Sequence, residues 1–254
     1  MTEERFTVNL SGKTAIVTGS SRGIGKAISL ALSQAGANVV IAARSEEESP
    51  TFPGTIHKTA EEIKELGGKA LAIRCDVTED GEVKSMVEQA METYGAIDIL
   101  VNNAGVMLGS SFLETDVIDF SNSWRVNVLG PFLCTKAVLH HMILRKSGSI
   151  VNISSGMAES DQPHSIIYSV SKVALNKMML KLAAETTEYN IAVNLLYPPM
   201  VRLERMIAMM PADMVDRLPP TSVVGPPAVW LAAQDASSFT GKIVQVNTFG
   251  TEWP

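Results

Sequence analysis

A strand, a glycine-rich turn and a helix over residues 14–25 constrain the fold of this chain more than any other stretch. An apolar, β-branched run predicts a buried strand, and apolar residues at helical spacing begin at Ile24. The turn between them holds Gly19, Gly23 and Gly25. Glycine tolerates positive φ and, without a Cβ, lets backbone approach a ligand, while a helix N-terminus attracts a pyrophosphate. The turn predicts dinucleotide binding, although its spacing is G-x-x-x-G-x-G and a tight turn without a ligand is the alternative.

Short apolar strands alternate with helices along the rest of the chain. The expected strands cover residues 14–18, 38–42, 69–74, 97–101, 149–154, 191–196 and 242–246. The expected helices cover residues 23–35, 56–66, about 78–94, about 116–145 and 166–189. No linker divides this alternation. It predicts an α/β, three-layer, doubly wound Rossmann-type fold with a seven-stranded parallel sheet, in a single domain over residues 1–254.

The composition argues against several classes of partner. Hydrophobic residues make up 46% of the chain, enough for a large core, and a net charge of −6 argues against binding to nucleic acid or an anionic membrane. No apolar run reaches the length of a membrane span and residues 1–10 lack a signal-peptide pattern, so we expect a cytoplasmic protein. Cys75 and Cys134 are expected to be core thiols, and no metal site is predicted.

The end of the second strand indicates which dinucleotide is bound. An acidic residue there would bind the ribose 2′-hydroxyl of NAD, whereas an arginine accommodates the 2′-phosphate of NADP. The strand ends without an acid before Arg44, and Arg22 lies in the glycine turn. Because two guanidinium groups can converge on one phosphate, we predict NADP(H). The alternative is that Arg44 pairs with Glu46 to Glu48 at the surface.

Three residues in the second half of the chain indicate proton-transfer chemistry. Tyr168 and Lys172 are four positions apart on a predicted helix and share one face. A neighbouring ammonium favours the phenolate and lowers a tyrosine pKa toward a range useful for proton transfer. Ser155 follows a strand, at the edge where open α/β sheets bind ligands, and its hydroxyl can hold a substrate carbonyl. The Tyr-x-x-x-Lys spacing alone also occurs by chance on helix surfaces.

These residues resemble the motifs of the short-chain dehydrogenase/reductase family, in its single-domain form, over essentially the whole chain. The matching motifs are TGSSRGIG (18–25), Asp76 after the third strand, NNAG (102–105), Asn127, Ser155 and YSVSK (168–172). A fainter similarity, in residues 54–71 and 238–246, points to the hydroxysteroid dehydrogenase-like branch of that family.

The resemblance implies a role for each matching position. Ser155 would orient the substrate carbonyl, Tyr168 would be the general acid or base, and Lys172 would bind the nicotinamide ribose and depress the tyrosine pKa. Asn127 would hold a water against Lys172 through its backbone carbonyl, and Asp76 would contact adenine. The implied cofactor-binding positions are Gly19, Ser21, Arg22, Gly23, Ile24, Gly25, Arg44, Asp76, Val77, Asn103, Ala104, Gly105, Tyr168, Lys172, Pro198 and Val201.

Two segments depart from the family pattern. After the sixth strand the family usually has Pro-Gly followed by a threonine that helps bind the nicotinamide carboxamide. Here Pro199 replaces the glycine, which fixes φ and removes a donor, and Leu203 stands where threonine is expected. Near the C-terminus, Val-Asp-Gly-Gly becomes Val246-Asn247-Thr248-Phe249-Gly250. Both changes affect the expected geometry around the nicotinamide more than the class of reaction.

Substrate recognition is expected in a lid at about residues 200–220. Methionine adapts to varied apolar ligands, and five methionines fall in this segment: Met200, Met206, Met209, Met210 and Met214. The alternative is that they pack onto the core. His164, between Ser155 and Tyr168, is a candidate for the pocket wall, with simple solvation as the alternative.

These patterns predict an NADP(H)-dependent oxidoreductase that interconverts a carbonyl and a secondary alcohol on an apolar small molecule. A nucleotide-binding regulatory or scaffold protein with little catalytic activity is the alternative, motivated by Pro199 and Leu203. A dehydratase or epimerase would need a larger sugar-nucleotide domain. The resemblance implies a homodimer or homotetramer built through the helices at about 116–145 and 166–189.

Overall fold

Seven apolar segments pair as parallel strands in a single sheet, in the order β3-β2-β1-β4-β5-β6-β7. The computed structural model describes residues 8–49, 52–109, 111–163, 165–204, 207 and 211–254. The strands are β1 (Thr14–Thr18), β2 (Asn38–Ala43), β3 (Lys69–Arg74), β4 (Ile99–Asn102), β5 (Gly148–Ile153), β6 (Ile191–Tyr197) and β7 (Ile243–Gln245). The predicted fold class is therefore confirmed, and each strand lies within two residues of its predicted ends.

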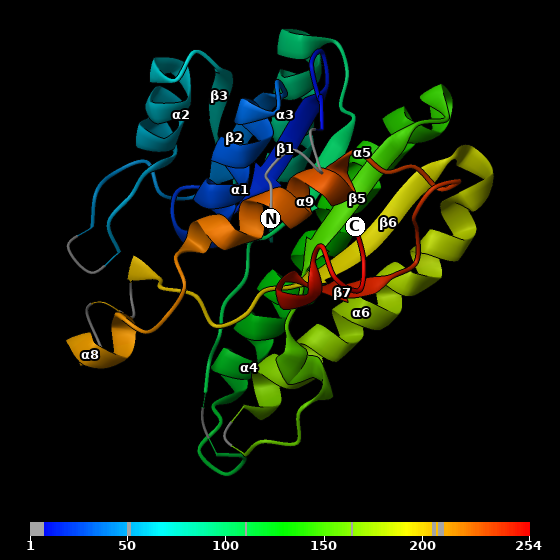
Figure 1. Cartoon of the computed structure of the whole chain (residues 1–254). Coiled ribbons are helices and arrows are strands. Elements are labelled where there is room, and N and C mark those ends of the chain that lie inside the picture. Colours follow the sequence, from blue (N-terminus) through cyan, green and yellow to red (C-terminus); the bar gives the residue numbers. More distant parts are fainter. Residues whose placement is uncertain (1–7, 50–51, 110, 164, 205–206, 208–210) are drawn as a thin grey trace.

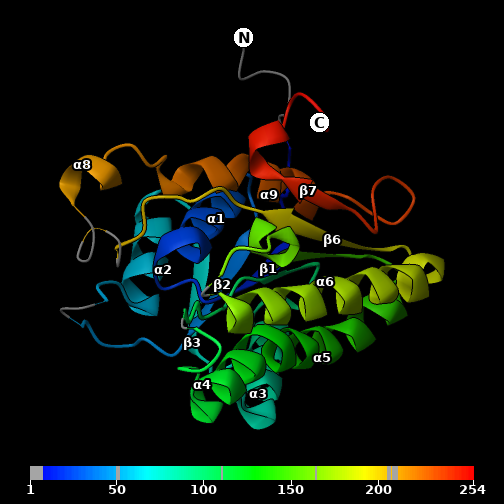
Figure 2. The ribbon, with the colours of Figure 1, turned by 90° about the horizontal axis from the view of Figure 1, so that it is seen from below.

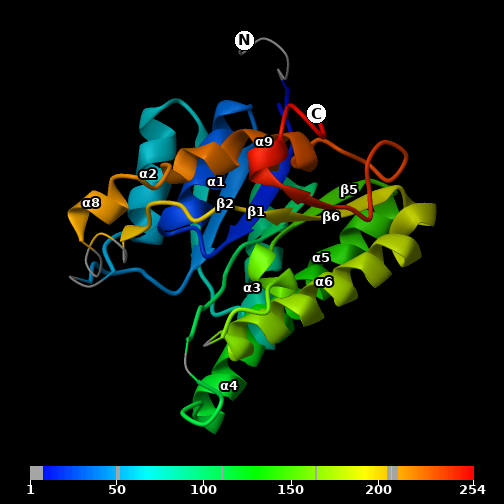
Figure 3. The same ribbon diagram turned by 60° about the horizontal axis from the view of Figure 1, so that its bottom comes forward.

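Helices cover both faces of the sheet. They are α1 (Gly23–Gln34), α2 (Ile56–Glu65), α3 (Asp80–Tyr94), α4 (Val117–Trp124), α5 (Gly130–Arg145), α6 (Ile166–Thr186), α8 (Ala212–Val215) and α9 (Gly225–Ala232). Figures 2 and 3 show α1, α2 and α9 on one face and α3, α5 and α6 on the other. Helix α8, which lies between β6 and α9 in the sequence, is placed beyond these layers (Figures 1 and 3).

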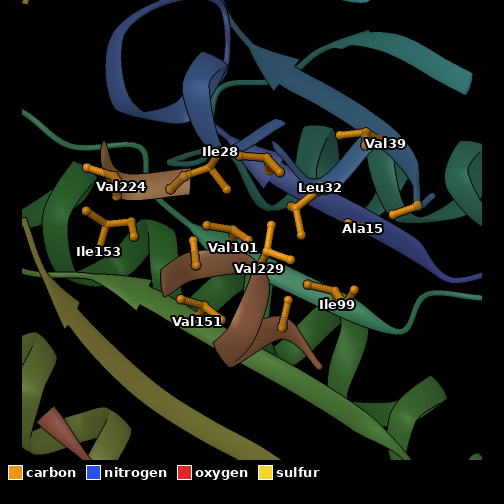
Figure 4. Close-up of a cluster of buried hydrophobic side chains, with 14 of the residues drawn as sticks. Ala15, Ile28, Leu32, Val39, Ile99, Val101, Val151, Ile153, Val224 and Val229 are labelled. Atoms are coloured by element: carbon orange, nitrogen blue, oxygen red, sulfur yellow. The ribbon is translucent and has the colours of Figure 1, made fainter. Parts of the chain in front are cut away.

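The core lies in two apolar layers, one on each side of the sheet. Ile28 and Leu32 of α1 and Val229 of α9 pack on the strands in one layer (Figure 4). Met86 of α3, Cys134 and Val138 of α5, and Leu175 of α6 pack in the other. The central strands, such as β1 and β4, are buried on both faces, which explains their nearly continuous apolar sequence. Cys75 and Cys134 are both free and buried, as predicted.

The strand order reverses between β1 and β4, and this reversal determines where a ligand site is expected at the edge of the sheet. The chain runs outward from β1 through β2 to β3, then returns to pair β4 with the other side of β1, Val17 lying opposite Val101. The loops that leave the carboxyl ends of β1 and β4 diverge at such a point, and a ligand can enter between them. The glycine turn and the segment around Gly105 are these two loops.

The predicted long helix over about 116–145 is wrong as one regular element. It is divided into α4, a π-helical turn (Arg125–Leu129) and α5, and the backbone N–H of Gly130 donates to the Arg125 carbonyl. Pro131 lacks an N–H, so a regular helical hydrogen bond from that position is not available. The hydrogen bonds thus change from the α-helical to the π-helical pattern for one turn, and the three elements follow one another without a break.

Helix α9 was not expected because it begins with Gly225-Pro226-Pro227, a sequence that usually breaks a helix. Both prolines lie in the first turn, where their missing N–H groups need no partner inside the helix. A Cβ on Gly225 would lie 2.8 Å from the Ala31 Cβ, so glycine lets α9 pack closely on α1.

Candidate active site

The glycine turn forms a cradle that only glycine can build. Gly19 and Gly23 have φ values of +66° and +58°, in the left-handed region. A Cβ on Gly19 would lie 2.8 Å from the Ala104 Cα, and one on Gly25 would collide with the Gly19 carbonyl. Arg22, the residue that precedes α1, provides no side-chain cap for that helix. A close backbone approach at a helix N-terminus fits the phosphates of a dinucleotide.

Asn103 joins the glycine turn to the loop that follows β4. Its side-chain amide donates to the Thr18 carbonyl at 2.8 Å and to the Gly19 carbonyl at 3.1 Å. In return, the Thr18 hydroxyl accepts hydrogen bonds from the backbone N–H groups of Asn103 and Ala104, both at 3.1 Å. The Asn103 amide thus holds protein backbone, and its predicted place beside the cofactor stays a prediction.

The two arginines chosen from the sequence lie near the end of β2 but have different surroundings. Arg22 donates to the Ser45 hydroxyl at 2.7 Å and to the Gly54 carbonyl at 3.1 Å, and its guanidinium lies over the Phe52 ring. Its Nε is buried and has no hydrogen-bond partner. Arg44 is 64% exposed and lies 3.5 Å from the Asp76 carboxylate, rather than against Glu46 to Glu48.

Asp76 is held as an anion in the loop after β3. It accepts hydrogen bonds from the Thr78 N–H at 3.0 Å and the Thr78 hydroxyl at 2.9 Å. Partial burial acts to raise the pKa of Asp76, but the bonds from Thr78 and the charge of Arg44 outweigh it, so the pKa lies below its usual range. The next residue, Val77, is buried, and Gly130 packs directly on it. Asp76 is therefore charged at neutral pH and already has partners.

Lys172 connects Tyr168 with the segment that carries Ser155, the two other residues predicted to take part in proton transfer. Its ammonium lies 5.6 Å from the centroid of the Tyr168 ring and donates to the Ile153 carbonyl at 2.9 Å, two residues before Ser155. Lys172 is only 4% exposed, and this burial lowers its pKa to about 8. The Ser155 hydroxyl accepts a hydrogen bond from the Met157 N–H, and Ser155 and Tyr168 are both half-buried. The fold thus brings the end of β5 and the Tyr168–Lys172 face of α6 together.

Asn127 lies in the π-helical turn and ties two other elements together. Its side chain exchanges hydrogen bonds with both the N–H and the carbonyl of Val106, each at 2.9 Å, and donates to the Ser171 hydroxyl. A Cβ on Gly105 would lie 3.3 Å from the Asn127 Oδ1 and 3.7 Å from the Lys172 Nζ. The NNAG loop, Asn127 and Lys172 therefore meet at one place. π-helical turns are frequent at functional sites.

A buried hydrogen-bonded chain beside these residues was not predicted from the sequence. Ser154 donates to Asn176 and Asn176 donates to the Tyr197 hydroxyl, both at 2.6 Å, and Tyr197 donates to the Glu159 carboxylate at 3.2 Å. Burial and the nearby Glu159 charge raise the pKa of Tyr197 to about 12, so it stays a neutral donor. Asn176 lies four residues after Lys172. The spacing of Tyr168 and Lys172, extended by one turn, would have indicated it.

The remaining predicted residues lie around this edge of the sheet. Ser21 is buried and Ile24 partly buried in the glycine turn, while Val201 is buried and Pro198 partly buried after β6. In the predicted lid, Met200 and Met214 are exposed instead of packed on the core. His164, Met206, Met209 and Met210 lie outside the described residues. Over the part of the chain that the structure describes, no group of acidic, histidine or cysteine side chains could hold a metal, and no helix is long and apolar enough to cross a membrane.

Comparison with known proteins finds one protein family. The family model for short chain dehydrogenases matches residues 13–213. Hydroxysteroid dehydrogenase-like protein 2 is 40% identical over 195 residues in Bos taurus and 35% identical over 241 residues in Danio rerio, matches that cover 76% and 94% of this chain. The matches span only 46% and 58% of those longer relatives. An uncharacterized oxidoreductase of Thermotoga maritima is 34% identical and matches over 94% of this chain and 98% of its own length.

Solved structures give the same result. A 7 alpha-hydroxysteroid dehydrogenase in complex with NADH and 7-oxo glycochenodeoxycholic acid has a TM-score of 0.85 and 28% identity, covering 98% of each chain. A gluconate 5-dehydrogenase of Burkholderia cenocepacia in complex with NADP and tartrate has a TM-score of 0.82 and 30% identity, covering 93% of this chain and 94% of that one. Because one holds NADH and the other NADP, these similarities leave the choice between the two cofactors open.

The burial of Lys172 predicts a dependence of stability on pH. Its pKa of about 8 in the folded protein is below the usual 10.5, so between these values the unfolded chain binds more protons and the free energy of unfolding rises with pH. At pH 7 both states carry the charge and its burial is unfavourable. Lys172→Met should therefore be more stable than the wild type by about 1–3 kcal/mol at pH 7, and this difference should shrink toward pH 10.5. Urea unfolding at the two pH values measures it.

Lys177→Met supplies the control because Lys177 is exposed on the same helix. It should change the free energy of unfolding by the same small amount at both pH values. A stability difference for Lys172→Met that stays constant with pH would contradict the burial of a charged amine.

Proposed function

The chain belongs to the short-chain dehydrogenase family, and on that premise we propose that it is an NADP(H)-dependent oxidoreductase that interconverts a carbonyl group and a secondary alcohol. The observation that carries the proposal is the cluster of Tyr168, Lys172 and the Ser155 segment, which lies beside Gly105 and hence beside the loop joined to the glycine turn. A protein that only binds a nucleotide has no need of a tyrosine placed against a buried ammonium.

The proposed mechanism assigns one task to each residue. The glycine turn would hold the phosphates of the cofactor, which when bound would supply hydride-transfer chemistry. The Ser155 hydroxyl donates a hydrogen bond to the substrate oxygen and fixes its orientation. In reduction, Tyr168 donates its proton to the oxygen as negative charge develops there, and in oxidation it removes that proton. Lys172 favours the phenolate form of Tyr168 by its charge, and Asn127 keeps Lys172 and the NNAG loop in place.

The choice of NADP(H) rests on the arginines near the end of β2. The Arg22 guanidinium is partly paired and has a buried Nε without a partner, and Arg44 is largely exposed. A 2′-phosphate would bring two negative charges to a place where two guanidinium groups lie, with Asp76 facing Arg44 and the Glu48 carboxylate acting on Arg22. Charge-assisted bonds of this kind are stronger than the neutral bonds that an NAD ribose would form.

An apolar substrate is proposed from the lid. Met200 is 62% exposed and Met214 is 51% exposed, on a segment that follows β6 directly. Unbranched, polarizable side chains that are not packed on the core can adapt to apolar ligands of varied shape.

A homodimer or homotetramer is proposed from the surface of the helices next to the site. Large apolar side chains are exposed on this surface: Phe120 and Trp124 of α4, Phe132 of α5, and Val170 and Val173 of α6. A groove of about 320 Å³ between α5 and α6 is lined by Phe132, Leu139, Met178 and Leu182, among others. Exposed apolar groups gathered on one face are typical of a subunit interface.

Replacing Tyr168 tests the catalytic role. Tyr168→Phe should lower turnover by about 10²–10⁴-fold, because the ring remains and only the transferable proton is lost. NADPH oxidation should be followed by absorbance over a panel of ketones, aldehydes and quinones, with NADPH binding measured by fluorescence. Tyr189→Phe, beyond the far end of α6, should keep its turnover. If the wild type binds NADPH but oxidises it with no member of the panel, the regulatory alternative gains support.

Replacing Arg44 tests the cofactor choice. Arg44→Ala should weaken NADPH binding by about tenfold or more and change NADH binding little, because only NADPH carries the 2′-phosphate. Arg74→Ala is the matched control, since Arg74 ends the neighbouring strand β3 and pairs with Glu82. Equal losses for NADPH and NADH in Arg44→Ala, measured by titration, would contradict the preference for NADP(H).

Charged substitutions test the proposed oligomer. Phe132→Asp and Val173→Asp should each shift the protein to a smaller species in sedimentation, because each removes apolar contact area and would take a carboxylate out of water. Leu66→Asp, at the exposed end of α2, should leave the size unchanged. A monomeric wild type at micromolar concentration would contradict this assembly.

A further inference from the structure

A carboxylate from the segment after β6 lies on the N-terminus of the first helix. The Glu204 carboxylate accepts a hydrogen bond from the backbone N–H of Gly23, at 3.1 Å. The neighbouring side chain also touches the turn, since a Cβ on Gly23 would lie 3.2 Å from the Leu203 Cδ2. Two residues that are about 180 positions from the glycine turn in sequence therefore pack directly against it.

The position of this carboxylate matters because Gly23 is the first residue of α1. Its N–H points out of the helix with the positive end of the helix dipole behind it, and Arg22 gives the helix no side-chain cap. Among the described residues, no lysine, arginine or histidine lies within ion-pair distance of Glu204. The helix N-terminus is thus the group that stabilises the Glu204 charge, and it is the same group that would stabilise a pyrophosphate.

The segment is anchored just before Glu204 and less so at Glu204 itself. Val201 is buried in the core. The Arg202 N–H donates to the Pro219 carbonyl at 2.9 Å, and the Arg202 guanidinium donates to the Asp216 carbonyl at 3.1 Å. Within the described part of the chain, the Glu204 side chain makes one hydrogen bond, the one with the Gly23 N–H. Its carboxylate can therefore leave the helix while Val201 and Arg202 remain in place.

We infer that Glu204 competes with the cofactor pyrophosphate for the N-terminus of α1, so that cofactor binding displaces the Glu204 carboxylate from the Gly23 N–H. Two anions cannot share one backbone donor, and at short distance they repel each other. The apparent affinity for the cofactor is then the intrinsic affinity multiplied by the fraction of molecules in which Glu204 does not hold the Gly23 N–H. The inference rests on the proposed function, because it requires that a dinucleotide binds at the glycine turn.

Glu204→Gln tests the competition, because glutamine keeps the shape and loses the charge. The variant should bind NADPH about three- to tenfold more tightly than the wild type, the range that a charge at a helix N-terminus controls. The inhibition constant of inorganic pyrophosphate against NADPH should fall by a similar factor, because both ligands would compete with Glu204 for the same N–H. Fluorescence titration of NADPH, without substrate or turnover, gives both values.

Asp213→Asn is the matched control, because Asp213 is an exposed acid in the same segment. It should leave NADPH affinity within about twofold of the wild type. Equal tightening in Glu204→Gln and Asp213→Asn would reveal a general charge effect and overturn the inference. An affinity in Glu204→Gln that is unchanged or weaker would also overturn it while leaving dinucleotide binding intact. Failure of every variant and of the wild type to bind NADPH or NADH would instead remove the proposed function.

Hydrogen exchange gives a second measurement that does not depend on the cofactor. Glu204→Ala removes the acceptor, so the Gly23 amide should exchange about threefold or more faster than in the wild type, with an unchanged melting temperature. An exchange rate equal to that of the wild type would show that Glu204 does not hold this N–H and would overturn the inference.

Discussion

Hydrogen bonds between the ends of β1 and β4 determine the geometry of everything proposed at this edge of the sheet. The Thr18 hydroxyl accepts from the loop after β4, and the Asn103 amide binds the backbone of the glycine turn in return. These two loops diverge at the reversal of strand order, and these bonds hold them together just beyond the paired ends of β1 and β4. The same loop continues to Gly105, which contacts Asn127 and Lys172. These hydrogen bonds thus set the distance between the turn proposed to bind phosphate and the residues proposed to transfer the proton.

Much of this arrangement could be predicted because it depends on the spacing of residues that are close together in the sequence. Buried parallel strands require continuous β-branched runs, and helices require apolar residues at spacings of three and four, so the seven strands and most helices were found. The glycine turn, Ser155 and the Tyr168–Lys172 pair could be proposed from the sequence for a related reason. Their chemistry depends on short spacings, and topology alone brings the carboxyl ends of the strands to one edge.

What could not be predicted depends on contacts between distant segments. The hydrogen bond from Asn176 to Tyr197 joins a helix to a strand 21 residues away, and the contact of Glu204 with Gly23 spans 181 residues. No local spacing encodes either. Helix α9 was missed for the opposite reason. The sequence Pro226-Pro227 usually indicates a break in a helix, but in the first turn of α9 both prolines are compatible with the helix. The pairing of Arg44 with Asp76 instead of the adjacent glutamates likewise follows from the register of β2 against β3.

The π-helical turn at Arg125–Leu129 contains one residue more than a regular α-helical turn. The wider turn takes up this residue, so α5 keeps the face that a regular helix would present, and Cys134, Val138 and Met142 stay buried. Removing one residue would give a regular helix with the same apolar face. It would, however, move Asn127 away from the N–H and the carbonyl of Val106, which its side chain binds. The extra residue therefore serves the reach of one side chain, and the packing of α5 does not require it.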